Sequence, residues 1–183
     1  MRILLTGGAG YIGSHTAIAL CAAGHEVVCF DNLSNSRADV MDRLATIIGQ
    51  AVPLVIGDIR DRHALEHAIA GHGIDAVIHF AGLKAVGEAV ANPLLYYDNN
   101  VRGTLSLIEA MIACNVKKLV FSSSATVYGQ PQYLPLDESL RWTRLFGQFG
   151  GEAKLIPGFY HAASRSVSVA GACPGNGRFS FAR

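Results

Sequence analysis

Residues 3–13 read ILLTGGAGYIG, and they are the strongest indication of the fold class. The apolar residues 3–6 predict a buried strand, and residues 14–23 read as a helix. Between them the spacing GxxGxxG gives each glycine a physical reason: Gly7 for a tight turn, Gly10 for a bare backbone facing a pyrophosphate, and Gly13 for close helix-to-strand packing. Strand, glycine loop and helix in this order are typical of dinucleotide binding. The alternative is a glycine-rich turn without a ligand.

The alternation of short apolar runs with longer helical patterns continues to about residue 124. It predicts five strands, at residues 3–6, 26–30, 53–56, 76–80 and 118–122. Most are continuously apolar, as strands covered on both faces are. We therefore expect an α/β fold: a Rossmann-type doubly wound parallel sheet, incomplete at five recognisable strands, with a ligand crevice at the carboxyl ends of the strands.

The clearest helical pattern follows Asn92-Pro93, where Asn92 is a candidate N-cap and proline takes the first helical position. Apolar residues recur along it at helical spacing. They are Leu94, Val101, Leu105, Ile108 and Ile112. We expect this stripe to pack on the sheet.

An acid stands where a dinucleotide site needs one. Asp31 directly follows the second expected strand, eighteen residues beyond Gly13, where a carboxylate can accept both ribose hydroxyls of an adenosine. This favours NAD, because a 2'-phosphate would meet Asp31 with like charge; Arg37 lies near enough to leave NADP open. Taken alone, Asp31 could equally be a solvated turn residue.

Composition limits the other functions. The formal net charge is +1 and no extended Lys/Arg run occurs, so we expect neither nucleic acid nor membrane as a partner. The four cysteines are scattered without a CxxC pair, which suits a reducing cytoplasm. The segment His63-Ala64-Leu65-Glu66-His67 matches the HxxEH zinc pattern, but it falls on a crossover helix away from the crevice and has no third ligand. We expect a solvated helix face there and no metal site.

The chain changes character near residue 140. Residues 140–183 carry six bases and one acid, whereas the preceding part carries nine bases and thirteen acids, and the apolar period is lost. We expect an NAD-binding domain over residues 1–139 and a poorly ordered, irregular tail over 140–183. A shifted reading frame or a foreign junction would explain the boundary, and the coding DNA would decide.

Several stretches together are more specific than a nucleotide fingerprint. They are TGGAGYIGSH (6–15), DNLSNS (31–36), GDIRD (57–61), HFAGLKAVGE (79–88), NNV (99–101) and SSSATVYG (122–129). Over residues 1 to about 139 the chain resembles the UDP-glucose 4-epimerase family of extended short-chain dehydrogenases/reductases.

The resemblance implies NAD as cofactor, a UDP-sugar as substrate of the full-length family, and a homodimer formed by the helix from Pro93 and its predecessor. By resemblance, the cofactor contacts are Tyr11 and Ile12 (pyrophosphate), Asp31, Asn32 and Ser36 (adenosine ribose), Asp58 and Ile59 (adenine), Phe80, Ala81, Gly82 and Lys84 (cofactor middle), Asn99, and Ser122 (nicotinamide ribose). Ser124 would hydrogen-bond the reacting hydroxyl. Read without the family, Lys84 is a solvated lysine and Ser124 a strand-end serine bonding its own backbone.

One catalytic element of the family is missing. Its members oxidise and reduce the sugar at C4 through NAD, and a tyrosine followed by a lysine four residues later removes the hydroxyl proton. No YxxxK occurs in residues 140–183, and Phe149 stands near the expected tyrosine. We expect an inactive chain. The alternatives are a non-catalytic NAD-binding module and a fragment of another sugar-nucleotide dehydratase or reductase.

Overall fold

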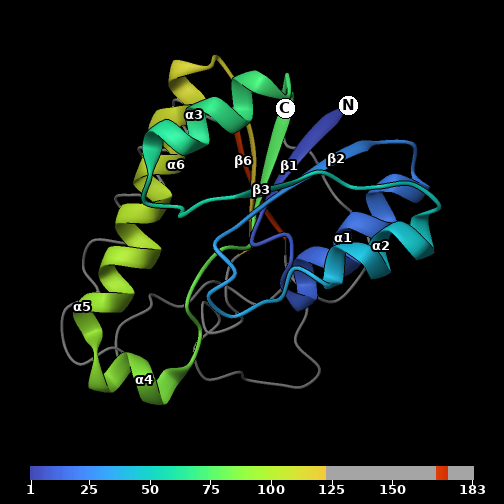
Figure 1. Ribbon diagram of the computed structural model, residues 1–183. Helices are drawn as coiled ribbons and strands as arrows, with labels where there is room; N and C mark the ends of the chain where they lie inside the picture. Colours follow the sequence, from blue (N-terminus) through green and yellow to red (C-terminus); the bar gives the residue numbers. More distant parts are fainter. Residues whose placement is uncertain (123–167, 173–183) are drawn as a thin grey trace, which may run out of the picture.

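The computed structural model describes residues 1–122 and 168–172, which form one parallel sheet with helices on both faces (Figure 1). Its six strands run in the order β3-β2-β1-β4-β5-β6. Their bounds are β1 Arg2–Thr6, β2 Glu26–Asp31, β3 Leu54–Ile56, β4 Ala76–His79, β5 Lys118–Ser122 and β6 Ser168–Ala172. The order reverses between β1 and β4, which is where doubly wound sheets bind their ligands.

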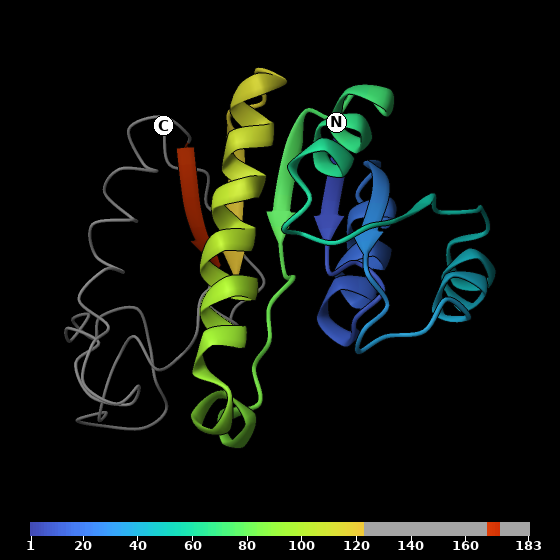
Figure 2. The same cartoon turned by 60° about the vertical axis from the view of Figure 1, so that its left-hand side comes forward.

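The α/β fold and all five predicted strands are confirmed, with ends that differ by one residue at most. One difference matters for the site, because Asp31 is the last residue of β2 and not the first residue after it. A sixth strand, β6, adds to the five expected ones and lies within the segment that we expected to be irregular. β6 lies parallel to β5, pairing Lys118 with Ser168 through Ser122 with Ala172 (Figure 2).

Two apolar cores lie on opposite faces of the sheet. Helices α1 Tyr11–Ala22 and α2 Val40–Ile48 cover one face, and α3 Arg62–Gly71 and α6 Gly103–Ala113 cover the other (Figure 1). Successive strand residues point to opposite faces, so Leu4 joins the α3/α6 core while Leu5 joins the α1/α2 core. Both leucines are completely buried. The sheet is therefore covered on both sides, as its continuously apolar strands predict.

The helix after Asn92 is built of three segments: α5 Pro93–Tyr96, the π-helical turn η1 Tyr97–Arg102, and α6. It comes after the short helix α4 Val86–Ala91. Proline takes the first helical position as expected, but the Asn92 side chain makes no capping hydrogen bond.

The expected packing of the apolar stripe is wrong for four of its five residues. Ile108 is buried, but Leu94 is 81% exposed, Ile112 56%, Leu105 43% and Val101 36%. The π-helical turn holds more residues per turn than an α-helix and so rotates the side chains of the next helical turns about the helix axis. The residues of α6 that pack inward are Gly103, Thr104, Ser106, Leu107, Ile108, Ala110 and Met111. The helix thus turns an apolar face outward.

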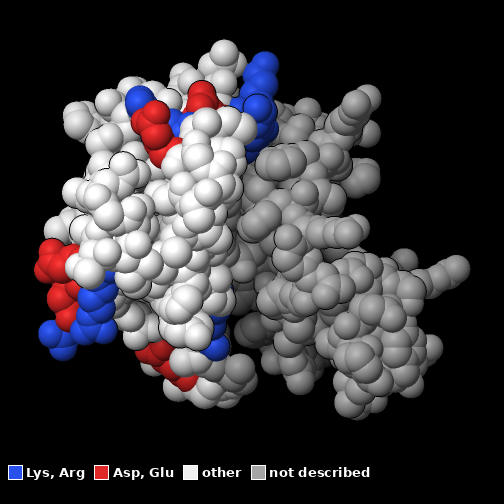
Figure 3. Space-filling view, turned by 90° about the vertical axis from the view of Figure 1, so that its right-hand side faces the viewer, with Lys and Arg blue, Asp and Glu red and all other residues white. Residues whose placement is uncertain are grey.

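Charged side chains form mixed groups. On the face shown in Figure 3, acidic and basic residues lie beside one another near the margins, and most of the middle is uncharged. Solvent-accessible pairs contribute little to stability, such as Arg43 of α2 with Asp39, the residue before this helix, at 3.1 Å. Within residues 1–122 and 168–172, no helix is long and apolar enough to cross a membrane.

Candidate dinucleotide-binding site

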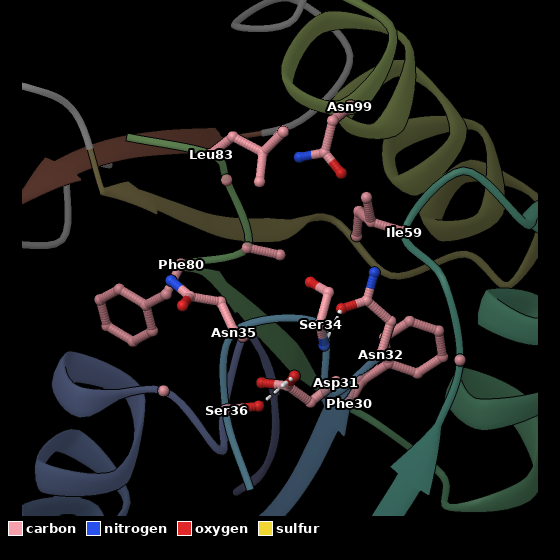
Figure 4. Close-up of a pocket in the computed structure, with 15 residues that line it drawn as sticks. Phe30, Asp31, Asn32, Ser34, Asn35, Ser36, Ile59, Phe80, Leu83 and Asn99 are labelled. Carbon is pink, nitrogen blue, oxygen red and sulfur yellow. Dashed lines mark hydrogen bonds between the residues drawn. The ribbon is translucent and has the colours of Figure 1, made fainter. Parts of the chain in front are cut away.

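A pocket opens at the carboxyl ends of β1, β2 and β4, at the point where the strand order reverses (Figure 4). Its lining comes from the glycine loop, the end of β2 with the loop after it, the β3–α3 loop, the β4–α4 loop and η1. The lining residues are Gly7, Gly10, Phe30, Asp31, Asn32, Ser34, Asn35, Ser36, Gly57, Ile59, Phe80, Ala81, Gly82, Leu83 and Asn99.

The glycine loop is packed so tightly that Gly7 and Gly13, the first and last glycines of the GxxGxxG pattern, have no room for a side chain. Gly7 has φ +71°, and a Cβ there would stand 2.7 Å from the Ala81 amide nitrogen. A Cβ on Gly13 would meet the Gly7 carbonyl oxygen and stand 2.8 Å from Gly8 Cα. Gly10 precedes the first turn of α1 and lines the pocket, where only the Gly7 carbonyl lies near its Cβ position, at 3.2 Å. The loop therefore presents bare backbone and a helix N-terminus to the pocket, which suits an anion.

Asp31 holds this loop and the loop after β2 together. Its Oδ2 accepts a hydrogen bond from the Ala9 amide at 3.1 Å, and its Oδ1 accepts from the Leu33 amide at 2.9 Å and the Ser36 hydroxyl at 2.8 Å. The residue Asp31 is only 8% exposed, and it lines the pocket beside Ser36 (Figure 4). A buried carboxylate with three donors is a well-satisfied acceptor that also reaches the ligand space.

A charge network joins the β3–α3 loop to the π-helical turn. Arg60 pairs with Asp58 at 2.8 Å and with Asp98 of η1 at 2.7 Å, and Asn32 donates to Asp58 at 3.3 Å. Hydrogen bonds from the Arg60 side chain hold the pKa of both the Asp58 and Asp98 carboxyls below their ordinary values. Asp58 itself does not line the pocket, so it stands behind Asn32, which does.

His79, the last residue of β4, is buried under the β4–α4 loop. Its Nδ1 lies 2.6 Å from the Thr6 hydroxyl and its Nε2 lies 3.1 Å from the Thr104 hydroxyl. Thr104 gives its proton to the Asn100 carbonyl at 2.6 Å, so Nε2 of His79 donates to Thr104 and Nδ1 accepts from Thr6. Burial, assisted by the charge of Lys84, lowers the pKa of His79 to about 4. This neutral ring fastens β1 and β4 to α6 directly behind the pocket.

The structure brings most of the expected cofactor residues to one pocket. Gly7, Gly10, Asp31, Asn32, Ser36, Ile59, Phe80, Ala81, Gly82 and Asn99 line it. Gly13, Tyr11, Ile12, Asp58, Lys84 and Ser122 stand next to it in the fold without lining it. The Tyr11 side chain, at the start of α1, is 80% exposed, and Ser122 ends β5. Ser124 lies outside the described residues.

Three lining residues were not expected from the sequence: Phe30, Gly57 and Leu83. Ser34 and Asn35 fall within the stretch 31–36, which the resemblance places at the adenosine ribose. Gly57 and Leu83 fall within other family stretches, and Phe30 ends the second expected strand, so their places beside strand ends were the available signal. Gly57 lies against the Phe30 ring, because a Cβ there would stand 2.6 Å from Phe30 Cζ.

The HxxEH segment lies on α3, where Glu66 accepts a hydrogen bond from Arg62 at 2.6 Å and His63 is almost fully exposed. Within the part of the chain that the structure describes, no group of three or more His, Cys, Asp or Glu side chains is placed to hold a metal ion.

Comparison with known proteins identifies the family. The model of the NAD dependent epimerase/dehydratase family matches residues 3–151, which is most of the chain. The chain belongs to this family. UDP-glucose 4-epimerase from Neisseria meningitidis serogroup C is 56% identical over 140 residues, covering 76% of the chain and 41% of the relative. The Bacillus subtilis UDP-glucose 4-epimerase is 51% identical over 172 residues, covering 93% of the chain and 51% of the relative.

Solved structures of the family match as well. The UDP-glucose-4-epimerase of Stenotrophomonas maltophila, with bound NAD and formylated UDP-arabinopyranose, has a TM-score of 0.83 and 41% identity over 93% of the chain and 52% of that protein. The enzyme of Bifidobacterium longum, in complex with NAD+ and UDP, has a TM-score of 0.81 and 44% identity over the same shares.

The matches also define how much of these relatives the chain represents. The chain spans about two fifths to one half of their length. The family match to residue 151 and the Bacillus subtilis alignment both reach beyond residue 139, where we expected the resemblance to end.

Proposed function

We propose that this chain forms the NAD-binding part of a UDP-glucose 4-epimerase, which interconverts UDP-glucose and UDP-galactose at C4. The observation that carries the proposal is the bond between the Ala9 amide and Asp31, which sets an acid and a bare glycine loop side by side at the reversal of the strand order. The match to the NAD dependent epimerase/dehydratase family supports NAD as the cofactor, and the relatives named UDP-glucose 4-epimerase support the reaction class.

The residues of the pocket fit the pyrophosphate and the adenosine half of a dinucleotide. The Gly10 backbone and the first amides of α1 would receive the pyrophosphate, because the helix dipole favours an anion there. Asp31 would accept the adenosine ribose hydroxyls. Arg37, which the sequence left as a candidate for binding a 2'-phosphate, pairs with Asp39 at 3.1 Å and so already has an acid beside it. We therefore propose NAD over NADP.

Bound NAD supplies hydride acceptance from C4 and hydride return to the same carbon. The chain's own part is to hold the cofactor by Ile59, Phe80 to Gly82 and Asn99, and, by family resemblance, to place Ser124 beside the reacting hydroxyl. Proton removal from that hydroxyl needs a base with a lowered pKa. No tyrosine of the chain has a lysine four residues later, so we propose that the chain binds NAD without turnover.

Isothermal titration of the purified chain with NAD and NADP, run beside a UDP-galactose turnover assay with added NAD, tests these statements. We expect NAD binding, weaker NADP binding, and no turnover. Turnover would refute the inactivity and would mean that a residue of the tail supplies the base. Absence of NAD binding would refute the cofactor site. Binding without turnover also fits a non-catalytic NAD-binding module or a dehydratase/reductase fragment, and titration with UDP-galactose against other UDP-sugars separates these.

We propose further that the chain forms a homodimer through the apolar face of α5, η1 and α6. This face consists of Leu94, Leu95, Tyr97, Val101, Leu105 and Ile112, each 36–81% exposed. Six exposed large apolar side chains along one helical run favour a protein partner over water. We place the protein in the cytoplasm, where Cys21, Cys29 and Cys114 would remain the free thiols that they are in the structure.

A further inference from the structure

The loop between β4 and α4, residues 80–85, joins the regular hydrogen bonding at its two ends, where the Phe80 amide donates to the Thr6 carbonyl and the Ala85 carbonyl accepts from the Ala89 amide. Between these ends, Ala81, Gly82 and Leu83 line the pocket together with Phe80. Such a loop has many accessible conformations, and holding one of them costs conformational entropy. Two of its amides, those of Leu83 and Ala85, donate to side chains instead of to backbone carbonyls. Both acceptor side chains come from the helical run that starts at Pro93.

Asn100, in the π-helical turn η1, makes two hydrogen bonds to a single residue of the loop. The Leu83 amide donates to Asn100 Oδ1 at 2.8 Å, and Asn100 Nδ2 donates to the Leu83 carbonyl at 2.9 Å. These two bonds fix both backbone polar groups of Leu83, its amide and its carbonyl. A single bond would leave the backbone free to rotate about it. The same Oδ1 accepts from Asn99 Nδ2 at 2.9 Å, so Asn100 also orients the neighbouring side chain that lines the pocket (Figure 4).

Tyr96, the last residue of α5, forms hydrogen bonds to the loop at Ala85, two residues after Leu83. The Ala85 amide donates to the Tyr96 hydroxyl oxygen at 3.1 Å, and that hydroxyl lies 2.9 Å from the Ala85 carbonyl and 2.8 Å from Glu88 Oε2. Burial, helped by the hydrogen bond to Glu88, raises the pKa of Tyr96, so the hydroxyl keeps its proton as a donor. The residue is only 8% exposed.

The hydrogen bonds at Leu83 and those at Ala85 lie on either side of Lys84, which is exposed. Tyr96 and Asn100 are four positions apart, and the π-helical turn begins between them. Because π-helical turns re-aim successive side chains, consecutive residues Asn99 and Asn100 can both face the loop and pocket. Neither Tyr96 nor Asn100 lines the pocket itself.

From these contacts we propose that Tyr96 and Asn100 are positioning residues that hold the 81–85 loop, and Asn99, in the conformation that receives the cofactor. This inference rests on the proposed NAD site. Neither residue touches the ligand space, so their effect on affinity comes from a loop already ordered before binding.

The test uses two nearly isosteric variants of the whole chain. Tyr96→Phe removes the acceptor of the Ala85 amide, and Asn100→Asp replaces the donor to the Leu83 carbonyl by a carboxylate oxygen. Tyr97→Phe and Asn92→Asp are matched controls. Asn92 is exposed just before Pro93, and Tyr97→Phe keeps the exposed aromatic ring of the apolar face and removes only its hydroxyl. Amide hydrogen exchange resolved by residue and NAD titration are measured on all five proteins, with thermal melts to show that each is folded.

We expect faster exchange of the Ala85 amide in Tyr96→Phe, faster exchange in the Leu83 segment in Asn100→Asp, and NAD affinity lower by roughly threefold to tenfold in each, the usual effect of one hydrogen bond. The controls keep wild-type values. In Asn100→Asp alone, affinity relative to the wild type recovers as the pH falls toward the ordinary carboxyl pKa, because a protonated carboxyl can again donate to the Leu83 carbonyl.

Two outcomes overturn the inference: unchanged exchange of Leu83 and Ala85 in the variants, or faster exchange with unaltered NAD affinity. If the wild-type chain fails to bind NAD, the proposed function fails. The exchange measurement then still decides whether Tyr96 and Asn100 hold the loop, because it needs no ligand.

Discussion

The Asp31 carboxylate accepts a hydrogen bond from the Ala9 amide at 3.1 Å, and this bond ties the end of β2 to the glycine loop after β1. The tie explains why the acid and the glycines form one site although they are far apart in sequence. It also means that Asp31 has two tasks, one toward the loop and one toward a ligand.

Asp31→Asn should weaken NAD binding roughly tenfold to a hundredfold, the effect of losing a charge-assisted hydrogen bond. An amide group has one acceptor oxygen where the carboxylate has two, so at least one of the donors Ala9, Leu33 and Ser36 would face an NH2 group. Titration calorimetry measures the change. Asp39→Asn, at an exposed acid on the surface beside α2, is the control and should bind as the wild type does. Equal affinities for all three proteins would remove Asp31 from the site.

Gly13→Ala should lower the melting temperature and NAD affinity together, because the new Cβ would meet the Gly7 carbonyl oxygen and push the loop from its position. Overpacking of this kind costs about 1–3 kcal/mol. Gly87→Ala is the matched control in another helix, since nothing lies within 4 Å of a Cβ there. Alanine is the better helix former, so that variant should melt at or above the wild-type temperature. A Gly13→Ala protein as stable as Gly87→Ala would contradict the packing argument.

The sequence was sufficient for features whose cause is local. Continuous apolar runs predicted β1 to β5, and glycine spacing predicted the loop at Gly7 to Gly13. Strand burial and tight turns depend on residues that are close together in the sequence. Features set by distant contacts were missed. The outward positions of Leu105 and Ile112 follow a π-helical turn that no residue pattern predicts.

The missed residues of the site have the same origin. Phe30 lines the pocket because Gly57 leaves space beside its ring, and Leu83 is held there by Asn100 from seventeen residues away. β6 pairs with β5 across more than forty intervening residues, most of them without a regular apolar period. Without such a period, the sequence around β6 gave no signal for a strand, and its pairing with β5 defines it.

Arg60→Gln should reduce stability most near pH 6 and least near pH 3. Hydrogen bonds from Arg60 keep the pKa of Asp58 and Asp98 below their ordinary values, so the stabilisation is present above the ordinary carboxyl pKa and is lost as the pH falls through the lowered values. Thermal melts from pH 3 to 6 measure the difference between variant and wild type. Arg43→Gln, which breaks an exposed pair with Asp39, should show little difference at any pH. A constant gap for Arg60→Gln across this range would mean that the network does not couple to proton binding.

His79→Gln should flatten the pH dependence of stability between pH 6.5 and 4. Burial lowers the pKa of His79 to about 4, so the unfolded chain binds the proton first as the pH falls, and the wild type loses roughly 3 kcal/mol over that interval. Glutamine is neutral and can still donate to Thr104. Urea unfolding at pH 7, 6 and 5 gives the slope, and His67→Gln, at an exposed histidine of α3, should keep the wild-type slope. Identical slopes for wild type and His79→Gln would place the proton uptake elsewhere.

Leu105→Glu should convert the proposed dimer to a monomer. Leu105 is 43% exposed in the middle of the apolar face formed by α5, η1 and α6, and a second copy of the chain would bury it against the same face. A buried, unpaired carboxylate in such an interface costs several kcal/mol, enough to shift micromolar association to dissociation. Light scattering on a sizing column should give the mass of one chain, 19.4 kDa, for this variant and twice that for the wild type. Ile47→Glu makes the same change at a 63% exposed position of α2, across the sheet, and should leave the dimer intact. A monomeric wild type, or a Leu105→Glu protein that stays dimeric, would show that this face is not the subunit contact.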